Sequence, residues 1–271
     1  MRSWTDLTVM YMKITCLVED RARPPLRAEH GLSLHIEGDV NILFDTGQSG
    51  LLMENAELLG VDLGDVDLAI LSHGHYDHGG GLTHFMEINE NAEVLTGEGA
   101  FRGRWAVEDG AERFIGIEEI TDPRIRLIDE DTVIHEGYTI LKGFSGPFRR
   151  PLGNRTLFME SAAGLVPDTF DDELVLVIDG PGGLTVVTGC SHNGILNILG
   201  TVRDHFPDRE IGTVVGGLHI SGDALYVASE IQEFEVGKIY TGHCTSEEAF
   251  KVLGRSCNVN VLRTGTVIEV D

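Results

Sequence analysis

The segment His73-Gly74-His75-Tyr76-Asp77-His78 places three imidazoles and one carboxylate within six residues. Histidine and aspartate are ligand types that Zn²⁺, Mn²⁺ and Fe²⁺ share. The segment follows the apolar stretch 68–72 and precedes the glycines 79–81, so these side chains are expected at the end of a strand, where the backbone turns freely. The spacing indicates that the four groups divide between two adjacent metal ions.

This segment, preceded by Phe44-Asp45-Thr46-Gly47, resembles the metal-binding motif of the metallo-β-lactamase superfamily. Other segments are similar to one archaeal and bacterial branch, the family named for 7,8-dihydropterin-6-yl-methyl-4-(β-D-ribofuranosyl)aminobenzene 5′-phosphate synthase. They are Glu29-His30-Gly31-Leu32-Ser33, residues 43–47, residues 189–195, Gly216-Gly217-Leu218-His219 and His243-Cys244-Thr245. The resemblance extends from about Met12 to the C-terminus.

The resemblance implies two divalent ions, with Zn²⁺ as the expected ion and Mn²⁺, Fe²⁺ or Mg²⁺ as alternatives. It places His73 and His75 on the first metal. It places Asp77, His78 and His243 on the second. Asp45 is expected to orient the histidine-rich loop through hydrogen bonds, because ligating imidazoles need such partners; the alternative is a turn former before Gly47.

The sequence departs from the superfamily pattern at two positions. Residues 168–173 contain no histidine where the superfamily has Gly-His-Thr, and Thr188-Gly189-Cys190 stands where it has Thr-Gly-Asp. His192 is expected to reach the first metal or to act as an acid–base group, and Cys190 either bridges the metals as a thiolate or packs. Residues 171–173 either replace the missing ligand or cap a strand.

The expected catalytic residues are Asp77, His192 and His219, of which His219 either holds a substrate phosphate or transfers a proton. His30 is a candidate at the edge of the site, with a structural role as the alternative. Arg149 and Arg150, with Arg155 nearby, are candidate phosphate ligands because the planar guanidinium binds phosphate well. Surface ion pairing is the alternative for these arginines.

The surrounding elements indicate an α/β fold. Apolar runs predict strands over residues 14–18, 32–37, 41–45, 68–72, 93–96, 125–128, 138–141, 174–179, 184–188, 211–215, 238–241, 259–262 and 266–270. Helical periodicity is found over residues 51–59, 194–205, 224–234 and 247–253. Their order suggests two sheets packed together with helices outside, and the resemblance implies that this arrangement is an αββα sandwich of the metallo-β-lactamase type. We expect one domain over residues 12–271, an N-terminal extension of unclear role over 1–11, and an inserted loop or lid over 97–123.

The net charge, the apolar runs and the cysteines disfavour several classes of protein. The chain of 271 residues carries 44 acidic and 20 basic side chains, a formal net charge of −24, which disfavours nucleic-acid binding. No apolar run approaches the roughly 18 residues of a membrane span. The first eleven residues do not read as a secretory signal, and the four cysteines show no close-spaced framework, so a cytoplasmic protein is expected. Assembly into a homo-oligomer stays open.

The resemblance implies an enzyme that acts on a small phosphorylated substrate. Its branch implies coupling of a dihydropterin methyl diphosphate to a ribofuranosylaminobenzene phosphate, with release of pyrophosphate, as in the biosynthesis of methanopterin-type cofactors. The alternative is a metal-dependent hydrolase of phosphodiesters or other small esters, because a metal pair also makes hydroxide at neutral pH. An alternative of another class is a di-iron redox or sensor protein.

Overall fold

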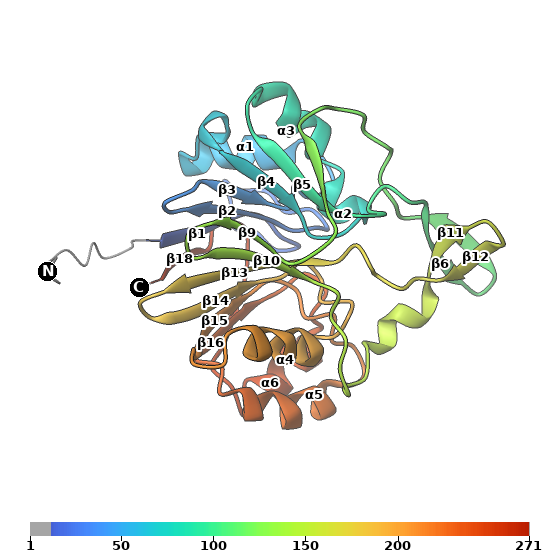
Figure 1. The fold of residues 1–271 in the computed structure, drawn as a ribbon, viewed down its shortest axis with the longest axis vertical. Helices are drawn as coiled ribbons and strands as arrows, with labels where there is room; N and C mark the ends of the chain where they lie inside the picture. Colours follow the sequence, from blue (N-terminus) through green and yellow to red (C-terminus); the bar gives the residue numbers. More distant parts are fainter. Residues whose placement is uncertain (1–11, 271) are drawn as a thin grey trace, which may run out of the picture.

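Buried strands rich in Val, Ile and Leu alternate with helices along residues 12–270, which are the residues that the computed structural model describes. Two seven-stranded sheets pack face to face, with helices on both outer sides (Figure 1). The expected αββα arrangement is confirmed. The expected extension over residues 1–11 lies outside the described part of the chain.

The first sheet has the strand order β18-β1-β2-β3-β4-β5-β8. Its strands are β1 (Met12–Val18), β2 (Ser33–Glu37), β3 (Ile42–Phe44), β4 (Leu68–Leu71), β5 (Glu93–Gly97), β8 (Ile125–Ile128) and β18 (Val267–Val270). The turn at Gly38-Asp39 joins β2 and β3 as an antiparallel pair, while β3, β4, β5 and β8 run parallel. The helices of this half are α1 (Leu51–Leu59), α2 (Tyr76–Gly79), α3 (Leu82–Ile88) and the 3₁₀ turn η1 (Leu63–Asp65).

The second sheet has the strand order β17-β16-β15-β14-β13-β10-β9. Its strands are β9 (Thr132–His135), β10 (Tyr138–Lys142), β13 (Leu174–Gly180), β14 (Gly183–Val187), β15 (Ile211–Val215), β16 (Lys238–Thr241) and β17 (Val259–Val261). Strands β14 to β17 run parallel. Their connections include α4 (Ile195–His205), α5 (Ala224–Glu230), the 3₁₀ turn η3 (Ile231–Phe234) and α6 (Glu247–Leu253).

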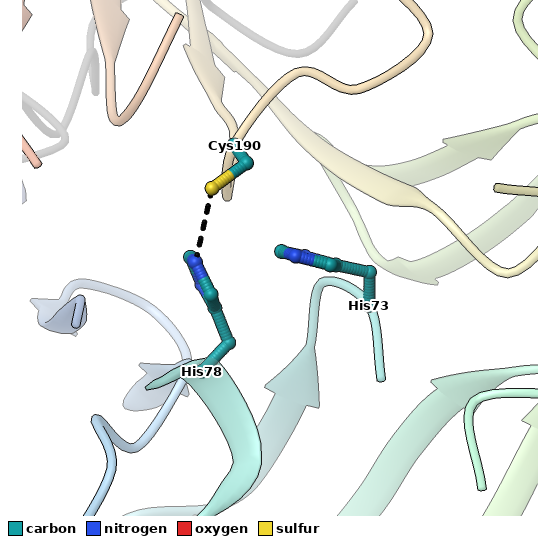
Figure 2. A group of neighbouring side chains, drawn as sticks. All are labelled: His73, His78 and Cys190. Carbon is teal, nitrogen blue, oxygen red and sulfur yellow. Dashed lines mark hydrogen bonds between the residues drawn. The ribbon is translucent and has the colours of Figure 1, made fainter. Parts of the chain in front are cut away.

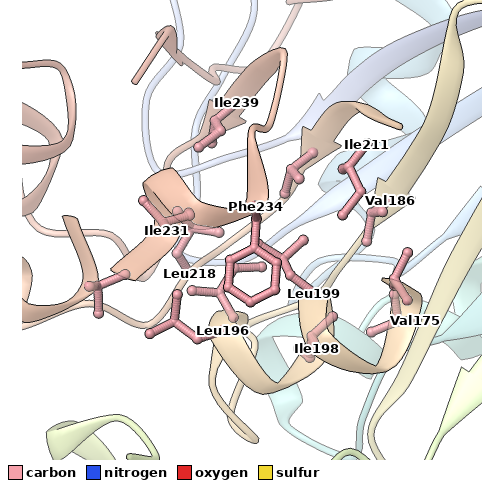
Figure 3. Close-up of a cluster of buried hydrophobic side chains, with 14 of the residues drawn as sticks. Val175, Val186, Leu196, Ile198, Leu199, Ile211, Leu218, Ile231, Phe234 and Ile239 are labelled. Carbon is pink, nitrogen blue, oxygen red and sulfur yellow. The ribbon is translucent and has the colours of Figure 1, made fainter. Parts of the chain in front are cut away.

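Three large apolar clusters of the described residues hold the sandwich together, and one of them packs α1 and α3 against the first sheet. Side chains of both sheets, such as Leu34, Phe44, Ile140 and Leu176, form one buried cluster. A second cluster joins the second sheet to α4, α5 and η3 (Figure 3). Because burial of each large aliphatic side chain contributes about 1.5–3 kcal/mol, these clusters give the loops at the strand ends a rigid base.

A small third sheet stands beside the sandwich, with the order β12-β11-β6-β7 (Figure 1). It contains β6 (Arg104–Glu108), β7 (Ala111–Phe114), β11 (Leu157–Ser161) and β12 (Gly164–Pro167), and the 3₁₀ turn η2 (Leu152–Thr156) precedes β11. The segment 97–123, expected as an inserted loop, therefore contains a hairpin. Both strands are short and lack the apolar alternation that identifies a strand; β7 is exposed throughout, and β6 pairs with β11 about fifty residues later.

No helix within the described residues is long and apolar enough to cross a membrane.

Candidate metal centre

Loops from both sheets meet at one edge of the sandwich. They follow β4 in the first sheet and β14, β15 and β16 in the second, so they leave the carboxyl ends of parallel strands, where ligand sites of α/β sheets are usually found. The histidine-rich loop requires glycine at position 74, because a Cβ there would lie 1.7 Å from the carbonyl oxygen of Ala100. This close packing holds the loop against its neighbour.

The first ligand group consists of His73, His75 and His192. Their ligating nitrogens lie within 4.8 Å of one another, although His192 comes from the other sheet. His73 Nε2 lies 3.1 Å from His75 Nδ1. The Nε2 atoms of His75 and His192 are buried and have no hydrogen-bond partner. Two buried imidazole nitrogens without partners are the arrangement that a bound cation would satisfy.

The second ligand group consists of Asp77, His78 and His243, whose ligand atoms also lie within 4.8 Å of one another. His243 Nε2 lies 3.1 Å from Asp77 Oδ2 and 3.3 Å from His78 Nε2. The structure thus brings together the six residues His73, His75, His192, Asp77, His78 and His243 as two neighbouring groups of three.

The pKa shifts of four of these residues, His73, His75, His192 and Asp77, fit a metal centre. Burial lowers the pKa of His75 to about 3 and holds the pKa values of His73 and His192 well below the usual value. Neutral imidazoles have free lone pairs for a cation. Burial opposes ionisation of Asp77, but the neighbouring His78 and His243 lower the pKa of its carboxyl group. The donor set of nitrogens and a carboxylate suits Zn²⁺ and related divalent ions.

Asp45 contacts both ends of the histidine-rich loop, at Ser72 and at His78. Its fully buried carboxylate accepts hydrogen bonds from the backbone and hydroxyl of Ser72, at 2.7 and 2.8 Å, and lies 2.6 Å from His78 Nδ1. These are the contacts that the expected orienting role of Asp45 requires. The bond to Nδ1 leaves His78 Nε2 facing the ligand group.

Glu19 and Asp20 support His243 in the same way, and sequence reasoning missed both. Glu19 accepts a hydrogen bond from the backbone N–H of His243, and Asp20 Oδ1 lies 2.8 Å from His243 Nδ1. The other Asp20 oxygen lies 2.9 Å from His30 Nδ1. Burial alone would lower the pKa of His243. The hydrogen bonds to Asp20 and Asp77 outweigh burial and raise this pKa well above its usual value. The only sequence signal is an acidic pair that follows the first strand.

The carboxylates of the acidic run 171–173 have hydrogen-bond partners away from the two ligand groups. Asp171 is exposed and accepts a hydrogen bond from the Thr169 hydroxyl. Asp172 accepts a hydrogen bond from the backbone of Gly74, and Glu173 accepts hydrogen bonds from the backbones of His192 and Asn193. Their carboxylates thus contact the backbone of loops that carry the candidate ligands, and none of the three belongs to a group of close ligand atoms among the described residues.

Cys190 points toward the ligand groups (Figure 2). Its Sγ lies 3.2 Å from His78 Nε2, and it forms a further set of close ligand atoms with His73 and His78. The thiol is almost completely buried, with 3% of the residue exposed. This position of the sulfur beside His78 fits both roles considered for Cys190, bridging the metals and packing.

A cavity of about 170 Å³ opens onto the ligand groups. Its lining includes His75, Asp77, His192 and His243 of the two ligand groups, the loop residues His30, Tyr76, Cys190, His219 and Cys244, and, on the side of the third sheet, Ala106, Glu108, Arg113, Ile115 and Leu157. Arg113 lies with its guanidinium carbon 6.0 Å from the centre of the Tyr76 ring. His30 and His219 thus lie at the site as expected.

The expected phosphate ligands Arg149, Arg150 and Arg155 do not line this cavity. Arg149 stacks on the ring of Tyr226, and Arg150 donates a hydrogen bond to the carbonyl oxygen of Thr169. Arg113 is the arginine that the structure brings to the site instead. Sequence reasoning missed it because it belongs to a hairpin without an apolar pattern.

Comparisons with known proteins show the family to which the sequence is similar. The family model described as the metallo-beta-lactamase superfamily matches residues 31–200. An uncharacterized protein of Methanocaldococcus jannaschii is 32% identical, with 95% of this chain and all of the relative covered. A second protein of that organism, 7,8-dihydropterin-6-methyl-4-(beta-D-ribofuranosyl)-aminobenzene-5'-phosphate synthase, is 30% identical, with 88% of this chain and 89% of the relative covered.

A solved structure extends the comparison to the fold. The crystal structure of Tm1679, described as a metal-dependent hydrolase of the beta-lactamase superfamily, superposes with a TM-score of 0.82 at 30% identity. The match covers 96% of this chain and 99% of that one.

Proposed function

Because this chain belongs to the metallo-β-lactamase superfamily, we propose that it is a metal-dependent synthase that couples a dihydropterin methyl diphosphate to a ribofuranosylaminobenzene phosphate. The observation that carries the proposal is its 30% identity, over 88% of the chain, to the M. jannaschii synthase. The two ligand groups beneath a covered cavity supply a site for the reaction.

The proposed reaction forms one C–N bond and breaks one C–O bond. The amine nitrogen attacks the methylene carbon of the pterin substrate, pyrophosphate leaves with the electron pair of the C–O bond, and the nitrogen loses one proton. When bound, divalent ions at the two ligand groups supply positive charge for the diphosphate and its leaving oxygen.

Residues of the chain bind the substrates and exclude water. Tyr76, Ile115 and Leu157 offer apolar surface to the flat rings, and the guanidinium of Arg113 binds a phosphate group. The third sheet lines one side of the cavity and so reduces the access of water to the electrophilic carbon. His30 lines the cavity with 52% of its side chain exposed and is held by Asp20, so it passes the amine proton to solvent.

A second candidate function is hydrolysis of a small ester, which the likeness to a metal-dependent hydrolase favours. In that case water replaces the amine as the nucleophile in the same cavity. The two functions differ in whether a second substrate is required.

Product analysis by mass spectrometry tests the proposal. Metal-loaded protein receives the dihydropterin methyl diphosphate with and without the aminobenzene phosphate. We expect pyrophosphate and the coupled product only when the amine is present. Pyrophosphate or phosphate release without the amine would favour the hydrolase, and no reaction with either substrate set would overturn the synthase.

Two arginine variants test how the substrate is bound. Arg113→Ala removes a charged phosphate ligand and should lower kcat/KM by roughly 10-fold or more, because hydrogen bonds to charged groups contribute about 1.5–3 kcal/mol. Arg102→Ala is the matched control, since Arg102 is exposed nearby and does not line the cavity. Equal kinetics of both variants would contradict the role of Arg113.

A further inference from the structure

Three softer ligands lie together beside the two ligand groups already described. They are Cys190, His219 and Cys244, and all three line the cavity. We propose that these residues bind a third, thiophilic divalent ion such as Zn²⁺ or Cd²⁺. This site is a prediction about metal binding and does not depend on which reaction the enzyme catalyses.

The geometry of the three side chains suits a single ion. Their ligand atoms lie within 4.8 Å of one another. With Zn–S bonds of about 2.3 Å and Zn–N bonds of about 2.0–2.1 Å, the ligands of a tetrahedral zinc lie roughly 3.5–3.8 Å apart. Side-chain movements of about 1 Å therefore close the set around one ion.

Three neighbouring strands of the second sheet position these ligands. Cys190 follows β14, His219 follows β15 and Cys244 follows β16. The backbone N–H of His219 donates a hydrogen bond to the Sγ of Cys244 at 3.2 Å. Gly217 leaves room for that sulfur, because a Cβ at this position would lie 2.4 Å from it. The sulfur is therefore held by the fold and is not a lone surface thiol.

One further observation at His219 points to a ligand, and a second concerns the backbone of the three loops. The Nδ1 atom of His219 is buried and has no hydrogen-bond partner. The backbone φ angles of Ser191, His219 and His243 are +63°, +48° and +43°. Side chains disfavour this left-handed region, and such strain is concentrated at functional sites. Each of the three loops thus adopts a costly conformation at, or next to, a residue of the set.

The donor types separate this site from the other two. The groups around His192 and Asp77 offer nitrogen and carboxylate oxygen, whereas this set offers two sulfurs and one nitrogen, which select thiophilic ions. Cys190 also lies 3.2 Å from His78 Nε2, so its thiolate can be shared with a neighbouring ion. A site with three protein ligands keeps its fourth position open, here toward the cavity.

Cobalt substitution tests the site without measuring turnover. Reduced, metal-free protein is loaded with Co²⁺ under anaerobic conditions, the ions per chain are counted, and the sulfur-to-cobalt charge-transfer absorption is recorded. We expect Cys244→Ser to bind one ion fewer than the wild type and to lose roughly half of this absorption, since one of two thiolate ligands is removed. Cys257→Ser, whose thiol lies outside every ligand group described, is the matched control and should behave as the wild type.

A second variant tests the same site independently, in case Cys244→Ser does not fold. His219→Asn removes the imidazole but tolerates the left-handed backbone, which asparagine adopts more readily than most residues. It should also bind one ion fewer while it keeps both thiols. An unchanged ion count and unchanged absorption in both variants would overturn the third site. So would a wild-type protein that shows no sulfur-to-cobalt absorption.

Discussion

The Asp45 carboxylate is completely buried, yet it has a partner for each of its oxygens. It accepts two hydrogen bonds from Ser72 and lies 2.6 Å from His78 Nδ1. A buried carboxylate is stable only with such partners. The same contacts decide which nitrogen of His78 faces the ligand group, so the contribution of Asp45 to metal binding can be tested without changing a ligand.

We expect Asp45→Asn to lower metal affinity by roughly 10–100-fold, the usual cost of removing a partner of a ligating histidine. Asparagine tolerates the φ angle of +60° at this position, but its amide nitrogen cannot accept a hydrogen bond. Competition with a chromophoric chelator measures the affinity. Asp62→Asn, at an exposed turn, is the control. Equal affinities of the two variants would rule out this role for Asp45.

Among the elements, the third sheet is connected to the metal centre through one buried side chain. Arg104 on β6 lies 2.9 Å from Asp168 and 2.5 Å from Asp172, and it is 2% exposed. The second oxygen of Asp172 accepts a hydrogen bond from the backbone of Gly74 in the histidine-rich loop. Asp172 therefore connects the third sheet to the histidine-rich loop.

Arg104→Ala should lower the free energy of unfolding by about 3–5 kcal/mol, because it leaves two buried carboxylates without their cation. Urea denaturation measures the change. Arg126→Ala breaks an ion pair of similar type, 3.8 Å from Glu93 but half-exposed, and should cost only about 0–1 kcal/mol. If the two variants were equally stable, Arg104 would not anchor the third sheet.

At the scale of the whole molecule, the ligand groups join the two sheets. His73, His75 and Asp77 follow β4 of the first sheet, whereas His192 and His243 follow β14 and β16 of the second. A bound ion therefore connects halves of the chain that otherwise meet through their apolar faces. It also offsets part of the net charge of −24.

Removal of metal should therefore lower the thermal unfolding midpoint. Free ion at about 100 times its Kd stabilises the folded state by about 2.7 kcal/mol per site. Differential scanning calorimetry in a chelator and in excess Zn²⁺ measures the shift. Asp77→Ala should bind one ion fewer, lose most of its activity and show a smaller shift. A midpoint that does not depend on metal would contradict the assignment of these ligands.

Much of this site could be predicted from the sequence because its central ligands are neighbours in the chain. His73, His75, Asp77 and His78 fall within six residues, so their spacing alone brings them together wherever the loop lies. The strands of the two sheets can also be predicted from the sequence, since burial on both faces selects long apolar runs. The order of these strands and helices also indicates two packed sheets with helices outside.

Only the tertiary structure decided which distant groups complete the site. Glu19 lies against His243 across 224 residues, and Arg104 meets Asp172 across 68. A carboxylate carries no sequence signal for the partner it will have, because that choice depends on which loops the folded sheets bring to one edge. The third sheet also depends on distant segments. Its short strands are stable only when residues 104–108 and 157–161, far apart in the chain, pair with each other.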